Sequence, residues 1–334
     1  MYHVRFKGNH YYAGFKWGKA LREHGKYINK NITPKLSKEK DDFTKECLPI
    51  YEKYCPEILE EIKGVATGQK ISYANLCTFL MSMYCFDSDV RCTCIATKDK
   101  NNILFGRNSD YLASIKKLYM NCIYKLEDAY SFNGNTTAFI EIEDGINEFG
   151  LAAGLTYVYP TIIKPGINAG ILVRIILEKC KTTKEAISLL NNIPIASQQT
   201  LTIADKTGDI VIVECNCEKI KIIKPNENCG FVTTANLFNS SEMMKYNNYE
   251  IDNWGSEKRY NTSYSVLKNH NENYSFDLIK DILSGKYGFM CQYDRKKDAD
   301  TVWSIIYDIK NGMIFRAEGN PKRTKYKKDI RFKF

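Results

Sequence analysis

The stretch from Cys92 to Tyr111, CTCIATKDKNNILFGRNSDY, carries the strongest local pattern in the sequence. Two apolar runs, Cys92 to Thr97 and Ile103 to Asn108, flank a polar turn, which predicts a β-hairpin. Asp110 lies 18 residues beyond Cys92, at the far end of the second strand. Because antiparallel strands run back alongside each other, we expect Asp110 to return beside Cys92.

The chain changes character on the two sides of this hairpin. Residues 11–84 have the three- and four-residue spacing of helices, as in Ile58, Ile62 and Val65, whereas strands and tight turns follow residue 91. The pair Asp144-Gly145 predicts the turn of a second hairpin, and Asn311-Gly312 the turn of a last one. Long runs of strands with helices between them favour a layered α+β fold over a parallel α/β sheet.

The amino-acid composition indicates the cellular compartment and the class of protein. The 334 residues are 44% hydrophobic, enough for a large core without disulfides or metals. Twelve cysteines and a start without a signal-like apolar stretch favour a reducing cytoplasm, with most thiols buried as small hydrophobes. No run of 18 apolar residues occurs, so no membrane-spanning helix is expected.

Two further patterns favour structural interpretations. The segment Lys322 to Lys333 carries much of the net charge of +9, but no nucleic-acid motif accompanies it. A solvated edge strand whose lysines discourage aggregation fits better, so we expect neither nucleic acid nor membrane as a partner. Cys215, Cys217 and Cys229 lack the paired CxxC spacing of structural zinc, and we expect no metal and no cofactor.

Histidine is scarce in this chain. Its four copies, His3, His10, His24 and His270, do not stand near a recognisable nucleophile motif. A serine or cysteine triad needs a histidine placed as its base. If the chain is an acyl-transfer enzyme, its base is expected to come from another group.

The run Cys92-Thr93, followed by Phe105-Gly106-Arg107-Asn108-Ser109-Asp110, resembles the mature start of a known superfamily. This superfamily of N-terminal-nucleophile hydrolases contains the choloylglycine hydrolases, the penicillin V acylases and the acyl-coenzyme A:isopenicillin N acyltransferases. Five later segments are similar to its motifs in the same order: Asn147–Leu155, Ala204–Gly208 with Val213-Glu214, Val232–Asn236, Ser256–Tyr260 and Thr301–Ser304. The helical first part resembles the long pro-region of the acyltransferase-type branch.

The resemblance implies a four-layer αββα sandwich, in which two antiparallel sheets lie between helix layers. Residues 1–91 would form a helical pro-segment that stays packed on the catalytic core, residues 92–334, as a small subunit. The chain would cut itself between Arg91 and Cys92, and Cys92 would then be the nucleophile. Its new α-amino group, with a pKa near ~8, could act as the base without a histidine.

The resemblance also assigns roles to other residues. Asp110 would orient the α-ammonium group, and Arg107 would favour the thiolate and could touch the substrate. The side-chain amide of Asn236 and a backbone N–H near Thr156 would stabilise the oxyanion. Arg259 would complete the polar network.

The sequence departs from the family pattern at two positions and leaves several alternatives open. Arg91 stands where acyltransferase-type relatives often have glycine, and Thr156 stands where the family hairpin often has asparagine. Cys94 is a rival nucleophile on the same strand face. The reaction could be hydrolysis of a linear, non-peptide amide in a small N-acyl substrate, or acyl transfer to an amine. The chain could also be a catalytically silent binding relative, and a homo-oligomer is left open.

Overall fold

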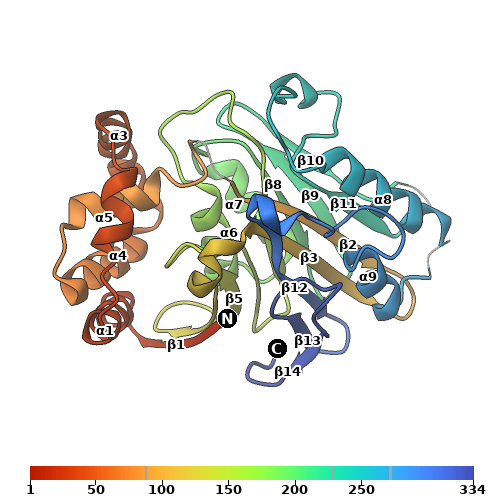
Figure 1. Ribbon diagram of the computed structural model, residues 1–334, viewed down its shortest axis with the longest axis horizontal. Coiled ribbons are helices and arrows are strands. Elements are labelled where there is room, and N and C mark those ends of the chain that lie inside the picture. Colours follow the sequence, from red (N-terminus) through yellow and green to blue (C-terminus); the bar gives the residue numbers. More distant parts are fainter. Residues whose placement is uncertain (87–88, 227–228, 271–272) are drawn as a thin grey trace.

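Two β-sheets stacked face to face form the centre of the protein (Figure 1). The computed structural model describes residues 1–86, 89–226, 229–270 and 273–334. The eight-stranded sheet contains, in spatial order, β1 (Tyr2–Gly8), β4 (Met120–Leu126), β5 (Phe132–Thr136), β6 (Asp144–Asn147), β7 (Ala152–Tyr157), β8 (Gln199–Ala204), β9 (Ile210–Cys215) and β10 (Ile220–Ile223). The six-stranded sheet contains β11 (Phe231–Thr234), β2 (Arg91–Lys98), β3 (Ile103–Leu112), β12 (Ala299–Asp308), β13 (Met313–Ala317) and β14 (Lys327–Asp329).

Helices cover the outer face of each sheet, which confirms the expected four-layer α+β sandwich (Figure 1). The eight-stranded sheet is covered by α6 (Ala169–Lys179), α7 (Thr183–Asn192) and a group of N-terminal helices. These are α1 (His10–Glu23), α2 (Asn29–Ile32), α3 (Lys38–Tyr54), α4 (Pro56–Gln69) and α5 (Tyr73–Met81). The six-stranded sheet is covered by α8 (Ser256–Asn269) and α9 (Phe276–Leu283). In the described part of the chain no helix is long and apolar enough to span a bilayer.

The predicted hairpin from residue 92 lies in the middle of the six-stranded sheet. Strands β2 and β3 pair antiparallel, with Cys92 opposite Ser109 and Arg91 opposite Asp110. Side chains alternate between the two faces of a strand, so Phe105 and Arg107 point towards the other sheet. Asn108 and Asp110 point instead towards the helix side, where they meet the end of α9 and the loop before β12.

The prediction of a turn at Asp144-Gly145 was wrong. Residues 144–147 form strand β6, and the hairpin turns at Glu148 to Gly150. The Asn147 side chain makes this turn, because its carboxamide oxygen accepts hydrogen bonds from the backbone N–H groups of Phe149 and Leu151, each at 3.1 Å. Gly150 supplies the positive φ of 79° that the turn requires. The expected last hairpin is present, with Gly312 between β12 and β13 at a φ of 65°.

The first residues of the chain were expected to precede a purely helical segment, but they form a strand. β1 pairs in parallel with β4 along its whole length, from Tyr2 opposite Met120 to Gly8 opposite Leu126. The N-terminal segment therefore contributes an edge strand to the core sheet as well as helices to its outer layer. The basic segment near the C-terminus forms the short edge strand β14, whose two lysines are exposed.

Helices α1 and α4 cross with their backbones in contact. Gly14 and Gly18 of α1 face Gly64 and Gly68 of α4, and each lacks room for a side chain. A β-carbon on Gly64, for example, would lie 2.1 Å from the carbonyl oxygen of Tyr11. The paired glycines thus allow the two helices to pack as one rigid unit.

A buried ion-pair network joins this helical unit to the core. Arg174 of α6 donates to Glu61 of α4 at 2.7 Å and to Glu178 at 2.6 Å, and all three side chains are buried. The Tyr124 hydroxyl donates to Glu61 at 3.2 Å, and His10 of α1 contacts Glu178 at 3.3 Å. Burial removes these charged groups from water, which costs free energy. Their ion pairs and hydrogen bonds must offset this cost.

We expect Glu61→Ala to lower the free energy of unfolding by about 3 kcal/mol, because it leaves part of the Arg174 charge buried without a partner. Urea unfolding measures the change, in a Cys92→Ala background that would prevent the cut expected before Cys92. Glu60→Ala is the matched control, since Glu60 is exposed and its one ion pair among the described residues is with Lys63, at 3.7 Å. This substitution should change stability by less than about 0.5 kcal/mol. Equal effects of the two substitutions would contradict the role given to the network.

Candidate active site

The Cys92 thiol lies between the two sheets and is fully buried. Its Sγ atom accepts a hydrogen bond from Nη2 of Arg107 at 2.8 Å. Burial raises the pKa of this thiol well above its ordinary value, and the nearby positive charge of Arg107 only partly opposes the rise. Burial therefore favours the neutral form of this thiol.

The backbone of Cys92 is bound from the other side of the strand. Its N–H donates to the carboxamide oxygen of Asn236 at 3.0 Å, and its carbonyl oxygen accepts from Nη1 of Arg259. Arg259 also donates to the same Asn236 oxygen and to the Thr93 hydroxyl, each at 2.8 Å. The nitrogen, the oxygen and the sulfur of Cys92 are thus each held by a different polar side chain.

These contacts also fix the orientation of the Asn236 side chain. Since its oxygen accepts two N–H groups, the nitrogen must be on the other branch, where it donates to the carbonyl oxygen of Tyr157 at 2.7 Å. An amide nitrogen carries two hydrogens, so one remains beyond the hydrogen bond to Tyr157. Asn236 follows directly after β11 and Ala235, and its backbone N–H donates to Ser256 at the start of α8.

Arg107 is held by two carboxylates, neither of which the sequence motifs assign to the site. Its guanidinium contacts Asp144 at 2.8 Å and Glu143 at 3.4 Å, and its Nε donates to the carbonyl oxygen of Leu155 at 3.0 Å. Glu143 also accepts from the Ser109 hydroxyl at 3.0 Å. The signal for these acids was present in residues 139–146, FIEIEDGI, where acidic side chains interrupt an apolar segment.

Asp110 lies on the helix side of β3 and is fully buried. It accepts hydrogen bonds from the hydroxyls of Thr301 at 2.6 Å and Tyr293 at 2.8 Å, and it lies 3.7 Å from Nη1 of Arg259. Burial raises the pKa of Asp110 to about 6, although Arg259 and the two hydroxyls act in the opposite direction. Asp110 is therefore linked to the Cys92 backbone through Arg259.

Thr156 and Cys94 lie in the same region. The Thr156 hydroxyl is engaged with that of Thr200, which in turn contacts the hydroxyl of Thr234 at 3.2 Å. Cys94 is buried two residues after Cys92, and burial raises its pKa to about 12, with Arg107 again acting in the opposite direction. The positive charge of Arg107 thus acts to lower the pKa of both thiols, but its hydrogen bond at 2.8 Å is to Cys92.

Arg91, which precedes the nucleophile candidate, is held in a pocket of aromatic rings and carbonyl groups. Its guanidinium lies 5.8 Å from the ring centre of Tyr157 and 5.9 Å from that of Trp254. It donates to the carbonyl oxygen of Asp252 at 2.8 Å. The Arg91 side chain is thus buried against the loop that leads into α8, directly beside Cys92.

Buried polar atoms without partners occur close to this junction. The hydroxyl of Tyr84 and one carboxylate oxygen of Glu141 have no hydrogen-bond partner in the described part of the chain. A β-carbon on Gly170 would lie 2.6 Å from that Glu141 oxygen and 3.0 Å from the Tyr84 ring, so the two groups share one site. Burial raises the pKa of Glu141 well above its usual range. Tyr84 also has a positive φ of 60°, a strained conformation for a bulky side chain.

The histidines make their polar contacts elsewhere. His10 contacts Glu178, and His3 contacts Glu318 at 2.8 Å. His24 and His270 bond to carbonyl oxygens one turn earlier in their own helices. In the part of the chain that the structure describes, no group of three His, Cys, Asp or Glu side chains is arranged to hold a metal ion.

A family model described as acyl-coenzyme A:6-aminopenicillanic acid acyl-transferase matches residues 96–323, which is more than half of the chain. The matched range includes Arg107, Asp110, Thr156, Asn236 and Arg259, and it begins shortly after Cys92. None of the curated proteins matches the sequence.

Several solved structures are similar to this chain at low sequence identity. Penicillin V acylase from Agrobacterium tumefaciens is 17% identical, with a TM-score of 0.44 over 68% of this chain and 82% of the acylase. A mutant of the conjugated bile acid hydrolase from Clostridium perfringens is 16% identical, with a TM-score of 0.46 over 73% of this chain and 97% of the hydrolase. A second variant of that hydrolase is 15% identical over the same shares, with a TM-score of 0.43.

The raised pKa of Asp110 predicts a pH-dependent stability. Because the folded chain holds this proton up to about pH 6 while the unfolded chain releases it near 3.8, stability is lost as pH rises between these values. Asp110→Asn removes this loss. Relative to the parent chain, its free energy of unfolding should therefore rise by about 2 kcal/mol between pH 4 and pH 7.

Urea unfolding of both proteins at the two pH values, in the Cys92→Ala background, tests this expectation. Asp110→Asn could also change stability equally at every pH through lost contacts with Thr301 or Tyr293. The test remains informative, because it compares how the free energy of unfolding of each protein changes between the two pH values. A difference between the two proteins that stays constant from pH 4 to pH 7 would show that Asp110 has an ordinary pKa.

Proposed function

Because the chain belongs to the acyl-coenzyme A:6-aminopenicillanic acid acyl-transferase family, we propose that it is a self-processing cysteine hydrolase of linear amides. Its substrates are small N-acyl compounds, and its nucleophile is Cys92. The observation that carries this proposal is the binding of all three polar atoms of Cys92, the sulfur by Arg107, the nitrogen by Asn236 and the oxygen by Arg259. Such an arrangement positions one residue far more strictly than packing alone requires.

The first reaction is proposed to be the cut before Cys92. The thiol attacks the carbonyl carbon of Arg91, the bond from this carbon to the Cys92 nitrogen breaks, and the nitrogen takes the proton. The resulting thioester is then hydrolysed by water, which leaves a carboxylate on Arg91 and frees the thiol and the amine of Cys92. The buried guanidinium of Arg91, held by Asp252, Tyr157 and Trp254, keeps the bond to be cut in a fixed position.

The second reaction is proposed to use the new α-amine as the base. Its pKa near ~8 allows it to accept the thiol proton at neutral pH. Asn236 already binds this nitrogen in the uncut chain, and Arg259 connects it to Asp110. Arg107 is placed to favour the thiolate that attacks the substrate carbonyl.

The acyl-enzyme intermediate can react in two ways, by hydrolysis or by transfer of the acyl group to an amine. The thiolate expels the amine of the substrate, and the remaining hydrogen of the Asn236 amide together with a backbone N–H near Thr156 stabilises the oxyanion. Water then releases the acyl group as an acid. A second candidate function is transfer of the acyl group to an amine, which the description of the matched family favours; adding an amine acceptor and measuring amide product against free acid separates the two.

The N-terminal segment is proposed to remain bound after the cut as a small subunit. Strand β1 lies in the core sheet, and the Arg174–Glu61 ion pair joins the segment to α6. We also propose a cytoplasmic location, since a reducing compartment keeps Cys92 and Cys94 as free thiols. If the cut does not occur, the chain would instead be a silent binding relative.

We expect intact mass spectrometry of the purified protein to find two chains, one ending at Arg91 and one beginning at Cys92. Cys92→Ala should remain a single chain because the attacking atom is missing. Cys94→Ala is the matched control and should be cut like the parent protein. A folded parent protein that stays uncut would favour the silent relative, and loss of the cut in Cys94→Ala alone would transfer the nucleophile role to Cys94.

Asn236→Ala should lower kcat for an N-acyl amide by roughly a hundredfold or more, because one oxyanion donor is lost. Turnover is measured with a panel of bile-salt conjugates, penicillins, acyl-amino acids and fatty-acyl amides. The control is Asn239→Ala, three residues further on, whose side chain makes one hydrogen bond within the described residues, to the Leu237 carbonyl at 3.3 Å. Equal losses in the two variants would argue against an oxyanion role for Asn236.

A further inference from the structure

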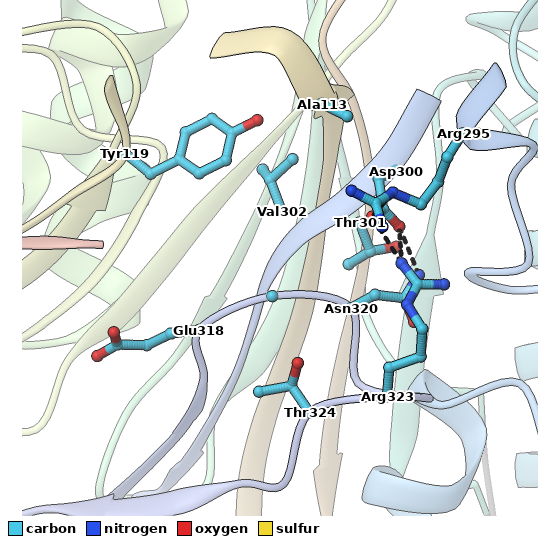
Figure 2. Close-up of a pocket in the computed structure, with 11 residues that line it drawn as sticks. Ala113, Tyr119, Arg295, Asp300, Thr301, Val302, Glu318, Asn320, Arg323 and Thr324 are labelled. Carbon is cyan, nitrogen blue, oxygen red and sulfur yellow. Dashed lines mark hydrogen bonds and ion pairs between the residues drawn. The ribbon is translucent and has the colours of Figure 1, made fainter. Parts of the chain in front are cut away.

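Two basic segments that are distant in sequence meet beside strand β12. The 3-10 helix Arg295–Lys297 precedes β12, and the turn with Lys322, Arg323 and Lys325 follows β13. A cavity of about 90 Å³ lies between them, lined mainly by polar and charged residues (Figure 2). We propose that this cavity binds the phosphate group of a small phosphorylated molecule.

Two guanidinium groups in the cavity wall contact the same carboxylate. Arg323 donates from a single nitrogen to both oxygens of Asp300, at 2.7 and 2.6 Å, and Arg295 lies 3.3 Å from the same carboxylate. Figure 2 shows the two arginines converging on Asp300. The other N–H groups of both arginines have no acceptor in the described part of the chain. One positive charge therefore remains, together with a set of donors suited to an oxyanion.

Asp300 is held firmly and so organises both arginines. Its side chain is only 12% exposed, and it also accepts from the Asn320 side chain at 2.8 Å. The Asn320 side chain donates in addition to the carbonyl oxygen of Cys291 at 2.6 Å. The backbone carbonyl oxygen of Asn320 accepts from the backbone N–H of Arg323 at 3.0 Å. Two like charges are thereby kept side by side before any ligand arrives, which lowers the cost of ordering them on binding.

The second carboxylate of the lining does not compete with an anion. Glu318 contacts His3 at 2.8 Å, so its carboxylate is engaged by a side chain outside the cavity lining. Figure 2 shows its carboxylate pointing away from Arg295 and Arg323. The side of the cavity that faces the two arginines is therefore positively charged.

The size and the openness of the cavity indicate the ligand class. Its volume of about 90 Å³ has room for about three water molecules, which suits one tetrahedral oxyanion rather than a whole metabolite. The arginine side chains are 60% and 46% exposed, so the rest of the ligand can extend into solvent. The Thr324 side chain adds a hydroxyl group to the lining.

The cavity is separate from the candidate active site but adjacent to it. Thr301 lines the cavity, and its hydroxyl donates to Asp110 at 2.6 Å. A ligand held beside Thr301 is therefore one hydrogen bond away from the carboxylate linked to Arg259 and Cys92. Binding of a phosphorylated compound could therefore influence the active centre through Thr301 and Asp110. Binding itself does not depend on whether Cys92 acts as proposed.

Isothermal titration of the full-length Cys92→Ala chain with inorganic phosphate, and separately with phenyl phosphate, tests the proposal at constant ionic strength. Arg323→Ala and Arg295→Gln should each weaken binding at least tenfold. Lys322→Ala removes the same charge one residue away from Arg323 without touching the lining, and should weaken binding less than threefold. Arg295 is largely exposed, so Arg295→Gln is expected to fold and keeps the test valid if Arg323→Ala does not.

Binding of phenyl phosphate at least as tight as that of inorganic phosphate would show that the site accepts a phosphate ester, whereas binding of inorganic phosphate alone would identify free phosphate. Either result supports the site. Equal losses in Arg323→Ala, Arg295→Gln and Lys322→Ala would overturn it, because they would show a diffuse attraction to the basic surface. Absence of phosphate binding to the parent chain would overturn it as well.

Discussion

The central constraint in this protein is the burial of the Arg107 guanidinium between its two sheets. A permanently charged group without solvent contact is tolerated only when opposite charges and hydrogen-bond acceptors surround it. The facing sheet provides them with Asp144, Glu143 and the Leu155 carbonyl, and Trp303 and Tyr307 hold Asp144 in turn. Cys92 occupies one remaining position around this guanidinium. The spacing of the sheets and the environment of the thiol are therefore set by the same interaction.

A second arginine has the corresponding role on the opposite face of the hairpin. Arg259 reaches from α8 to the Cys92 carbonyl, to Asn236 and to Asp110, and it too is fully buried. One strand residue is thus bound by a guanidinium on each side, through its sulfur on one face and its backbone on the other. Small shifts of either sheet or of α8 would be transmitted directly to Cys92, since both arginines are fixed by further partners.

The sequence predicted the local part of this arrangement well. Alternating apolar residues and a short polar turn specify the hairpin of β2 and β3, because both strands and their connection lie within 22 residues. Parallel pairing of β1 with β4 was missed, since it joins residues more than 110 positions apart and leaves no periodic mark in the sequence. Asp144 was assigned to a turn because Asp-Gly favours one, but its carboxylate is bound by Arg107 from the other sheet. An ion pair between residues of different sheets cannot be predicted from the residues next to either partner in the sequence.

The placement of β1 has a consequence for how the protein can be made. In the uncut chain, β1 and β4 meet as parts of one molecule, at the millimolar effective concentration that a covalent connection provides. After a cut before Cys92, two denatured chains would have to find each other by diffusion at their much lower bulk concentration, and the strand, the helices and the ion pair of Arg174 would have to reassemble in one event. The mature protein would then be kinetically trapped, with a lifetime set by its rate of unfolding instead of by a reversible equilibrium.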